Sequence, residues 1–286
     1  MRNSFLLIIV MLSFNAFAGN GLDAIYGMDN RVFIHSKMDT SILVQSKAVA
    51  MIVDQENLTK RMFKSKLADK SLQDSIQLCS DEKFSTKPSL KACTGFLVKS
   101  NILLTAGHCI VDENDCATKK IIFDVLDSTS KFSNKNRSVN NSVVYNCKSI
   151  IARGQDENSD FSLIELDKSI TDRSPLELSH SSLISRPASV YMIGHPYGLS
   201  LMLSRSSSVS TLDSNDLIFK ASINSFQGNS GSPVFNSETH KVEGVLVNGQ
   251  EDLVFDSQNK CYRYRVYNGA GGEGILSISH ILPFIN

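Results

Sequence analysis

Short apolar segments bounded by turn-forming residues recur along most of this 286-residue chain. Segments such as Cys93–Val98, Phe161–Leu166 and Val242–Val247 have the length and β-branched content of strands. Helical periodicity is rare, so the pattern predicts an all-β barrel or sandwich. The stretch 171–187, which is rich in serine and contains two prolines, is expected to separate two β units.

The sequence predicts the secondary structure of several segments more specifically. Residues 93–98 and 102–105 predict a hairpin that turns at Lys99–Asn101. The alternation over 40–53 predicts one or two strands, and 278–285 predicts a short helix or strand. The polar stretch 56–78 is compatible with either a helical insertion or a long surface connection.

Residues 1–18 have the composition of a secretory signal peptide. Arg2 precedes an apolar run, and Ala16-Phe17-Ala18 is a small-residue cleavage site. We therefore expect a secreted protein, extracellular or periplasmic, with no membrane association after cleavage. Residues 19–39 form an N-terminal segment, of which 19–24 could be a short propeptide.

Charge and cysteine content narrow the class further. The 29 basic and 29 acidic residues cancel, and no long basic block predicts a nucleic-acid partner or a polybasic membrane patch. Six cysteines in an exported chain predict three disulfides. No C-x-x-C or H-E-x-x-H spacing predicts a metal site, and no cofactor is expected. The glycine-rich stretch 269–274 lacks the lysine of a phosphate-binding loop and predicts a flexible loop instead.

Three motifs supply the parts of a nucleophilic catalyst in the order His, Asp, Ser. They are Thr105-Ala106-Gly107-His108-Cys109, an Asp160 that opens a strand, and Gly228-Asn229-Ser230-Gly231-Ser232-Pro233. A serine hydroxyl is a weak nucleophile at neutral pH and needs a base and a carboxylate that orients the base. Asp156 is the nearest alternative to Asp160, and His195 is the next histidine of interest after His108, although its setting favours a loop residue.

These motifs resemble those of the trypsin/chymotrypsin-like serine peptidases, over roughly residues 92–247. The finer resemblance is to the secreted bacterial glutamyl endopeptidase and trypsin-like branch, through Gly-Asn-Ser-Gly-Ser-Pro and the segment Ile25–Arg31. The resemblance implies two six-stranded antiparallel β-barrels, residues 40–175 and 176–286, with the active site in the cleft between them. It also implies a Ser-His-Asp triad of His108, Asp160 and Ser230, with the N–H groups of Gly228 and Ser230 as the oxyanion hole.

The resemblance implies a disulfide between Cys93 and Cys109. The other four cysteines allow three pairings, of which we favour Cys116 with Cys147 and Cys79 with Cys261; free thiols at Cys79 and Cys261 are the alternative. Asn229 stands where trypsins have an aspartate that pairs with the freed N-terminus, which argues against activation in the trypsin form.

Substrate specificity is less determined by the sequence. Asn224 and Ser225 are expected to line the S1 pocket, and Asn224 replaces the aspartate on which strict Lys/Arg preference depends. Leu246 stands where glutamyl endopeptidases have a histidine. Val247, Asn248 and Gly249 are expected to form the edge against which an extended substrate adds a strand.

The sequence as a whole predicts a secreted, monomeric serine endopeptidase that acts on proteins or peptides through an acyl-enzyme. The alternative is a binding or envelope protein on a peptidase fold with little or no proteolysis.

Overall fold

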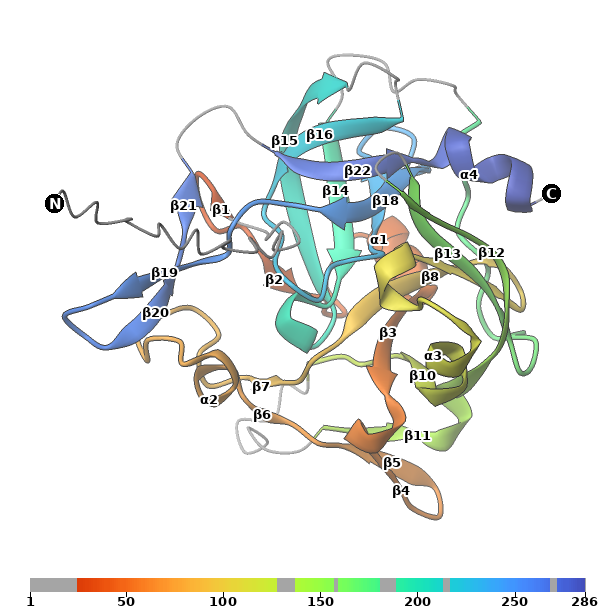
Figure 1. Cartoon of the computed structure of the whole chain (residues 1–286), viewed down its shortest axis with the longest axis horizontal. Helices are drawn as coiled ribbons and strands as arrows, with labels where there is room; N and C mark the ends of the chain where they lie inside the picture. The colour runs from red at the N-terminus through yellow and green to blue at the C-terminus, as the bar shows by residue number, and fades with distance from the viewer. Residues whose placement is uncertain are drawn as a thin grey trace, which may run out of the picture.

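The computed structural model describes residues 25–127, 137–156, 159–180, 189–212, 217–267 and 272–285. The predicted signal peptide and residues 19–24 lie outside these ranges. The described chain is mostly β, with two large antiparallel sheets and several small ones around them (Figure 1).

The first large sheet is a closed barrel in which the strands follow the order β10-β12-β13-β9-β8-β3. Its strands are β3 Val49–Asp54, β8 Cys93–Lys99, β9 Ile102–Thr105, β10 Lys119–Phe123, β12 Val144–Asp156 and β13 Ser159–Leu166. The β8–β9 pair is the hairpin predicted from the sequence. Apolar side chains fill the barrel because alternate residues of each strand point inward. The register places Phe96, Leu104 and Leu163 opposite one another on one face of these strands, and all three are completely buried.

The second large sheet is strongly curled and has seven strands in the order β14-β17-β18-β22-β16-β15-β2, and β14 also pairs with β15. Its strands are β2 Val32–Phe33, β14 Ser189–Gly194, β15 Met202–Leu212, β16 Ile218–Ile223, β17 Pro233–Asn236, β18 Val242–Asn248 and β22 Glu273–Ser277. The predicted all-β, chymotrypsin-like class is therefore confirmed. The expected six strands of the second unit gain a seventh, because β2 of the N-terminal segment pairs with Met202 and Leu203.

Smaller elements decorate the two large sheets. The short strands are β1 Ile25–Tyr26, β4 Leu58–Lys60, β5 Lys64–Leu67, β6 Lys70–Ser71, β7 Pro88–Ser89, β11 Ser138–Asn140, β19 Leu253–Asp256, β20 Cys261–Tyr264 and β21 Val266–Tyr267. The α-helices are α1 Thr40–Ser46, α2 Leu72–Ile76, α3 Glu113–Thr118 and α4 Ile278–Ile285. Short 3₁₀ helices are η1 Gln55–Asn57, η2 Gly107–Cys109, η3 Asn141–Val143 and η4 Pro196–Gly198. The polar stretch 56–78 is thus mainly a set of short strands, with one helical turn at its end.

The expectation of strands throughout residues 40–53 was wrong. The alternating residues 40–53 form helix α1 followed by strand β3, not strands throughout. The helix buries Ile42 and Ser46, which are four residues apart and so lie on one helical face. A seven-residue helix shows too few turns for this spacing to be separated from the alternation of a strand.

Three disulfides join distant elements. Cys93 is bonded to Cys109, Cys116 to Cys147, and Cys79 to Cys261. These are the pairings favoured from the sequence. The Cys79–Cys261 bond, which spans 182 residues, ties the segment after α2 to strand β20.

A buried cation packs beneath the serine-containing turn. Arg31 is 0% exposed, forms a 2.8 Å ion pair with Asp29, and places its guanidinium 3.8 Å from the Phe226 ring centre and 4.6 Å from that of Tyr264. Burial opposes the charge, but the hydrogen bonds with Asp29 raise the pKa of Arg31, so the group stays cationic. This contact supports Phe226, the residue that leads into the turn.

The C-terminal helix α4 bridges the two large sheets. It packs against β18 and β22 of the second sheet and against β13 of the first, where Phe284 lies 5.2 Å from Phe161. None of the helices in the described part of the chain has the length and apolar character needed to cross a membrane.

Candidate active site

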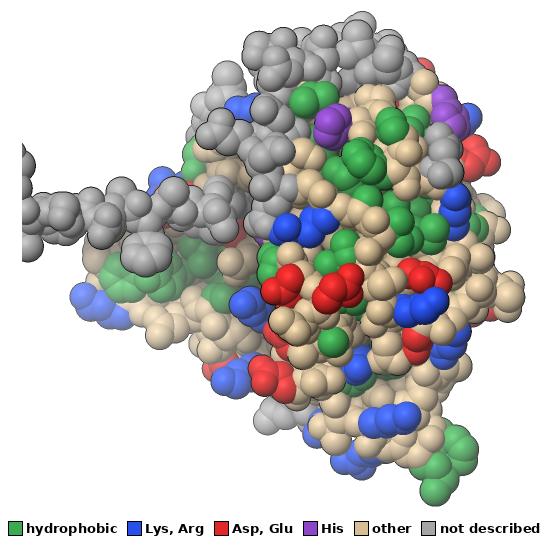
Figure 2. Space-filling view, turned by 45° about the vertical axis from the view of Figure 1, so that its right-hand side comes forward, with side chains coloured by type: hydrophobic (Ala, Val, Ile, Leu, Met, Phe, Trp, Pro, Cys, Tyr) green, Lys and Arg blue, Asp and Glu red, His purple; other side chains and the backbone are tan. Residues whose placement is uncertain are grey.

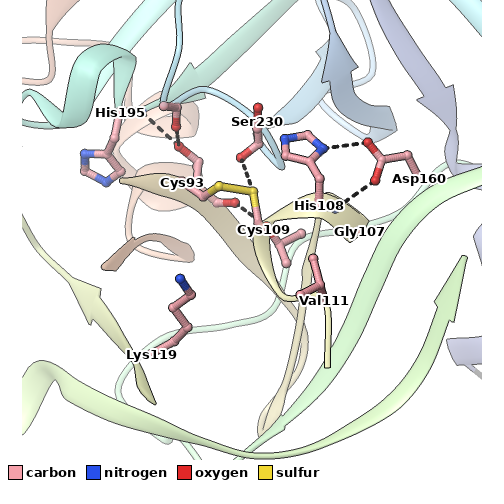
Figure 3. The surroundings of a disulfide bond; sticks show 12 residues. Cys93, Gly107, His108, Cys109, Val111, Lys119, Asp160, His195 and Ser230 are labelled. Carbon is pink, nitrogen blue, oxygen red and sulfur yellow. Dashed lines mark hydrogen bonds and ion pairs between the residues drawn. A yellow bond between two sulfur atoms is a disulfide. The ribbon is translucent and has the colours of Figure 1, made fainter. Parts of the chain in front are cut away.

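Asp160 and His108 meet at the edge of the first barrel. Strand β9 ends at Thr105, and the 3₁₀ turn that follows carries His108 out of the barrel. Asp160 is the second residue of β13. Its Oδ1 accepts a hydrogen bond from the His108 main-chain N–H at 2.9 Å, and its Oδ2 lies 2.7 Å from His108 Nδ1 (Figure 3).

This two-point contact orients the imidazole. A carboxylate can only accept from a neutral ring, so Nδ1 carries the proton and Nε2 is left as the basic nitrogen. The side chains of His108 and Asp160 are 32% and 23% exposed, which leaves the ring accessible from solvent. Asp160, the residue preferred over Asp156 from the sequence, is the carboxylate that contacts His108.

Ser230 lies beside the His108 ring, above the Cys93–Cys109 disulfide (Figure 3). The two residues line the same cleft of about 360 Å³ together with Gln227 and Gly228. Within the described ranges no hydrogen bond joins His108 to Ser230. Hydrogen bonds between catalytic groups are often long in a ligand-free enzyme and shorten when substrate binds.

The glycines on either side of Ser230 are required by the local packing. Gly228 has φ +100°, and a Cβ there would lie 2.5 Å from the His195 carbonyl oxygen. Gly231 has φ +85°, and its Cβ would lie 2.1 Å from the Thr94 carbonyl oxygen. Both positions are therefore restricted by conformation and by space. The absence of a Cβ lets the serine turn approach both large sheets closely.

The same turn presents two main-chain donors. Asn229 N–H donates to the Phe226 carbonyl at 2.9 Å, and the Gln227 carbonyl accepts from Tyr197 N–H. Across the described residues, neither Gly228 N–H nor Ser230 N–H has a hydrogen-bond acceptor. The two groups predicted to form an oxyanion hole are thus free to bind a developing negative charge.

Thr94, which the sequence analysis missed, links this turn to the first barrel. Its N–H donates to the Ser230 carbonyl at 2.9 Å, and its hydroxyl donates to the Gly228 carbonyl at 2.8 Å. The hydroxyl also accepts from His195 N–H at 3.1 Å. In the sequence, only the position of Thr94 next to Cys93 pointed to a role for it. Its hydroxyl contacts Gly228 and His195, which lie more than 100 residues away along the chain.

The predicted S1 residues are buried and already hydrogen-bonded. Asn224 Oδ1 accepts from Tyr26 N–H at 2.7 Å, and Nδ2 donates to the Met28 carbonyl at 2.8 Å. Ser225 Oγ accepts from Asn229 Nδ2 at 3.3 Å. The polar atoms of Asn224 therefore hold the N-terminal segment, which becomes part of this side of the site.

Strand β18 runs past the serine turn and fixes its position. Gly231 N–H donates to the Leu246 carbonyl at 2.8 Å, and Leu246 N–H donates to the Ser232 carbonyl at 3.0 Å. Leu246 and Val247 are buried, Asn248 at the end of the strand is exposed, and Gly249 follows it half-buried.

Glu273 is a second residue that the sequence analysis missed. It is 0% exposed at the start of β22, the strand that pairs with β18, and its Oε1 accepts from the Tyr26 hydroxyl at 2.9 Å. The sequence predicted a flexible loop over residues 269–274, which is wrong at Glu273 and Gly274, because both belong to strand β22 and pair with its neighbours. The burial of Glu273 beside the N-terminal segment therefore had no signal in the sequence. The rest of that stretch, residues 269–271, lies outside the described residues.

His195 is placed outside the triad. It lies on the other side of the disulfide from Asp160 (Figure 3), is 1% exposed, and contacts the Leu199 carbonyl through Nδ1 at 2.9 Å. Complete burial lowers its pKa from 6.5 to about 3, although the Leu199 contact acts in the opposite direction. His195 is therefore a neutral structural donor.

The residues at this site cannot act together as metal ligands. Cys93, His108 and Cys109 lie close enough to share an ion. However, the two sulfurs are joined in a disulfide, so neither is available as a thiolate.

Comparison with known families identifies the domain. A family model described as a trypsin-like peptidase domain matches residues 93–245, more than half of the chain. No curated protein matches the chain.

Solved structures share the fold at low sequence identity. A glutamyl endopeptidase in complex with MPD is 17% identical with a TM-score of 0.53, covering 92% of this chain and 97% of its own. A serine endoprotease from Yersinia pestis is 11% identical with a TM-score of 0.50, covering 87% and 65%. The inactivated protease paralogue S-D1 of the scabies mite is 16% identical with a TM-score of 0.51, covering 85% and 92%.

Proposed function

Because the chain belongs to the trypsin-like peptidase family, we propose that it is a serine endopeptidase in which Ser230 is the nucleophile and His108 the general base. The observation that carries this proposal is the two-point contact of Asp160 with His108, which fixes the tautomer that a general base requires. The free N–H groups of Gly228 and Ser230 support it independently.

In the proposed acylation step, Ser230 Oγ attacks the carbonyl carbon of the scissile bond and His108 Nε2 takes the hydroxyl proton. The negative charge that forms on the carbonyl oxygen is bound by the N–H groups of Gly228 and Ser230. When the C–N bond breaks, His108 gives its proton to the leaving amine. Water then attacks the acyl-enzyme in the same way, with His108 again as base and then as acid.

The proposed substrates are proteins or peptides in extended conformation. We place the substrate strand along Val247–Gly249, where β18 ends beside the serine turn. Main-chain hydrogen bonds to such an edge bind many sequences. That Asn224 and Ser225 line the pocket for the side chain before the cleaved bond stays a prediction from the sequence.

The proposed location is outside the cytoplasm. The three disulfides and the secretory pattern of residues 1–18 both support export. N-terminal sequencing of the exported protein tests this proposal: a chain that begins at Gly19 or Ile25 agrees with it, and a chain that retains Met1 contradicts it.

One observation favours a second candidate function. An inactivated protease paralogue has the same fold as this chain, so the fold alone is compatible with a binding protein that does not cleave peptides. The two candidates differ in whether the oriented His108 is used for proton transfer.

Cleavage of a peptide library by the exported protein tests the proposed function. We expect cleavage that Ser230→Ala reduces by roughly 10⁶-fold, whereas Ser237→Ala, at a half-buried serine that directly follows β17, leaves it unchanged. The same library gives the preferred residue before the cleaved bond. Absence of cleavage by a folded, processed protein would support the binding function instead.

A further inference from the structure

A protruding hairpin presents two large apolar side chains to solvent. Strands β4 and β5 pair antiparallel, and the turn between them consists of Arg61, Met62 and Phe63. Met62 is 83% exposed and Phe63 is 77% exposed. The hairpin projects from the lower edge of the molecule in Figure 1, away from both large sheets.

Asn141 holds this turn in one conformation. Its Nδ2 donates to the Arg61 carbonyl at 2.8 Å and to the Met62 carbonyl at 3.2 Å, and its N–H donates to the Phe63 carbonyl at 3.1 Å. Ser65 Oγ in turn donates to Asn141 Oδ1 at 2.7 Å. The two apolar side chains are therefore presented by a hydrogen-bonded scaffold. Exposed apolar side chains held in this way mark interaction sites.

Positive charge surrounds the apolar tip. Lys60, Arg61 and Lys64 are exposed and Lys66 is half-buried, and no acidic residue occurs between Leu58 and Ala68. Throughout the described ranges, none of these four cations forms an ion pair. Figure 2 shows hydrophobic side chains at the lowest point of the molecule with Lys and Arg side chains next to them.

A basic pocket lies beside the hairpin. Lys60, Lys120 and Lys168 line a cavity of about 380 Å³ together with Asn146 and Asp167. Asp167 is engaged by Asn146, which donates to it through its main-chain N–H at 3.1 Å and its side-chain amide at 2.6 Å. The three lysines thus outnumber the one carboxylate, and the pocket attracts anions.

We propose that this hairpin docks on an anionic lipid bilayer. Met62 and Phe63 enter the boundary between headgroups and acyl chains, and the surrounding cations contact lipid phosphates. Charge complementarity favours a lipid surface as the partner, because the tip is convex and apolar and the cations around it form no ion pair within the described residues. Two protruding side chains offer far less area than the roughly 800 Å² per partner of a stable protein interface.

The proposal revises the sequence-based expectation of no membrane association after cleavage of the signal peptide. The cations gather instead at one hairpin, where the short turn sets Lys60, Arg61 and Lys64 on either side of Met62 and Phe63. Membrane docking does not depend on peptidase activity, since the hairpin lies outside the cleft lined by His108 and Ser230.

Co-sedimentation of the processed protein with phosphatidylcholine vesicles, with and without phosphatidylglycerol, tests the proposal. We expect binding that requires phosphatidylglycerol and weakens as salt is added. Met62→Ser/Phe63→Ser should weaken it by about ten-fold or more. Lys60→Gln/Lys64→Gln should weaken it by about 25-fold, since each basic residue near an anionic surface contributes roughly five-fold.

Val44→Ser is the matched control, because Val44 is 57% exposed on α1 and lies outside the hairpin. It should leave binding unchanged, and thermal unfolding should show that all variants remain folded. Three results would each overturn the proposal: no binding by the wild-type protein, equal binding by the Met62→Ser/Phe63→Ser variant, or binding without phosphatidylglycerol. Self-association of the wild-type protein that this variant abolishes would also overturn it, in favour of a protein contact.

Discussion

The carboxylate of Asp160 contacts His108 at two points, the main-chain N–H at 2.9 Å and ring Nδ1 at 2.7 Å. An asparagine could still accept from the main-chain N–H, but its amide group would face Nδ1 with a donor. The ring would then carry its proton on Nε2, the nitrogen that has to act as base.

Asp160→Asn should therefore lower kcat by roughly 10⁴-fold, as the loss of the correct histidine tautomer does in other Ser-His-Asp peptidases. Steady-state kinetics on a peptide ester measure the effect. Asp156→Asn is the control and should retain nearly full activity. A loss of less than ten-fold in Asp160→Asn would show that Asp160 does not control the tautomer of His108.

Gly231→Ala should destabilise the protein by about 3 kcal/mol or more, because it adds a clash with main-chain and side-chain atoms to the cost of a positive φ. Its Cβ would lie 2.1 Å from the Thr94 carbonyl and 2.2 Å from Thr105 Oγ1. Urea unfolding measures this change.

Gly27→Ala is the matched comparison for Gly231→Ala. Gly27 has φ +72°, but a Cβ there would meet nothing within 4 Å, so conformational strain of about 1 kcal/mol is the whole expected cost. Equal losses in the two variants would contradict the packing that we describe around the serine turn.

Thr94→Val should slow acylation while the protein stays folded. The change removes the hydroxyl that donates to the Gly228 carbonyl and accepts from His195 N–H, both of which are buried. Leaving buried polar groups without partners costs about 1–3 kcal/mol. Thr94→Ser retains the hydroxyl and should restore the rate. If Thr94→Val and Thr94→Ser acylate equally fast, the hydroxyl does not position the turn.

The free energy of unfolding should depend on His195 at acid pH. Its pKa is about 3 in the folded state and 6.5 as the ordinary value, so between these pH values the unfolded chain binds the extra proton. This stabilisation is complete above pH 6.5 and is lost as pH falls toward 3, by about 1.4 kcal/mol per pH unit.

His195→Asn should flatten this dependence, because the amide can still donate to the Leu199 carbonyl but does not titrate. Urea unfolding from pH 7 to pH 4 measures the difference between the two proteins. Parallel curves for the wild type and the variant would show that His195 does not contribute to acid destabilisation.

The strands of this fold were predictable where local pattern and burial agree. The hairpin of β8 and β9 was expected from its apolar runs and polar turn. Helix α1 was not, because its β-branched residues favour strands locally and only packing against the first barrel makes Ile42 and Ser46 inward-facing.

The triad was recognisable because each of its three motifs is a short continuous stretch of sequence. The residues that hold these motifs in place come from distant parts of the chain. Thr94, Glu273 and the Asn224 contacts all join segments that are far apart in sequence. Arg31 had no signal at all, since arginine is rarely buried and its aromatic surroundings come from three separate parts of the chain.

Covalent labelling with a fluorophosphonate, read by intact mass and peptide mapping, tests the central claim most directly. The account predicts one adduct per chain, on Ser230, that is lost in Ser230→Ala and strongly slowed in His108→Ala. A folded and processed protein that remains unlabelled, or that carries its adduct on another serine, would contradict it.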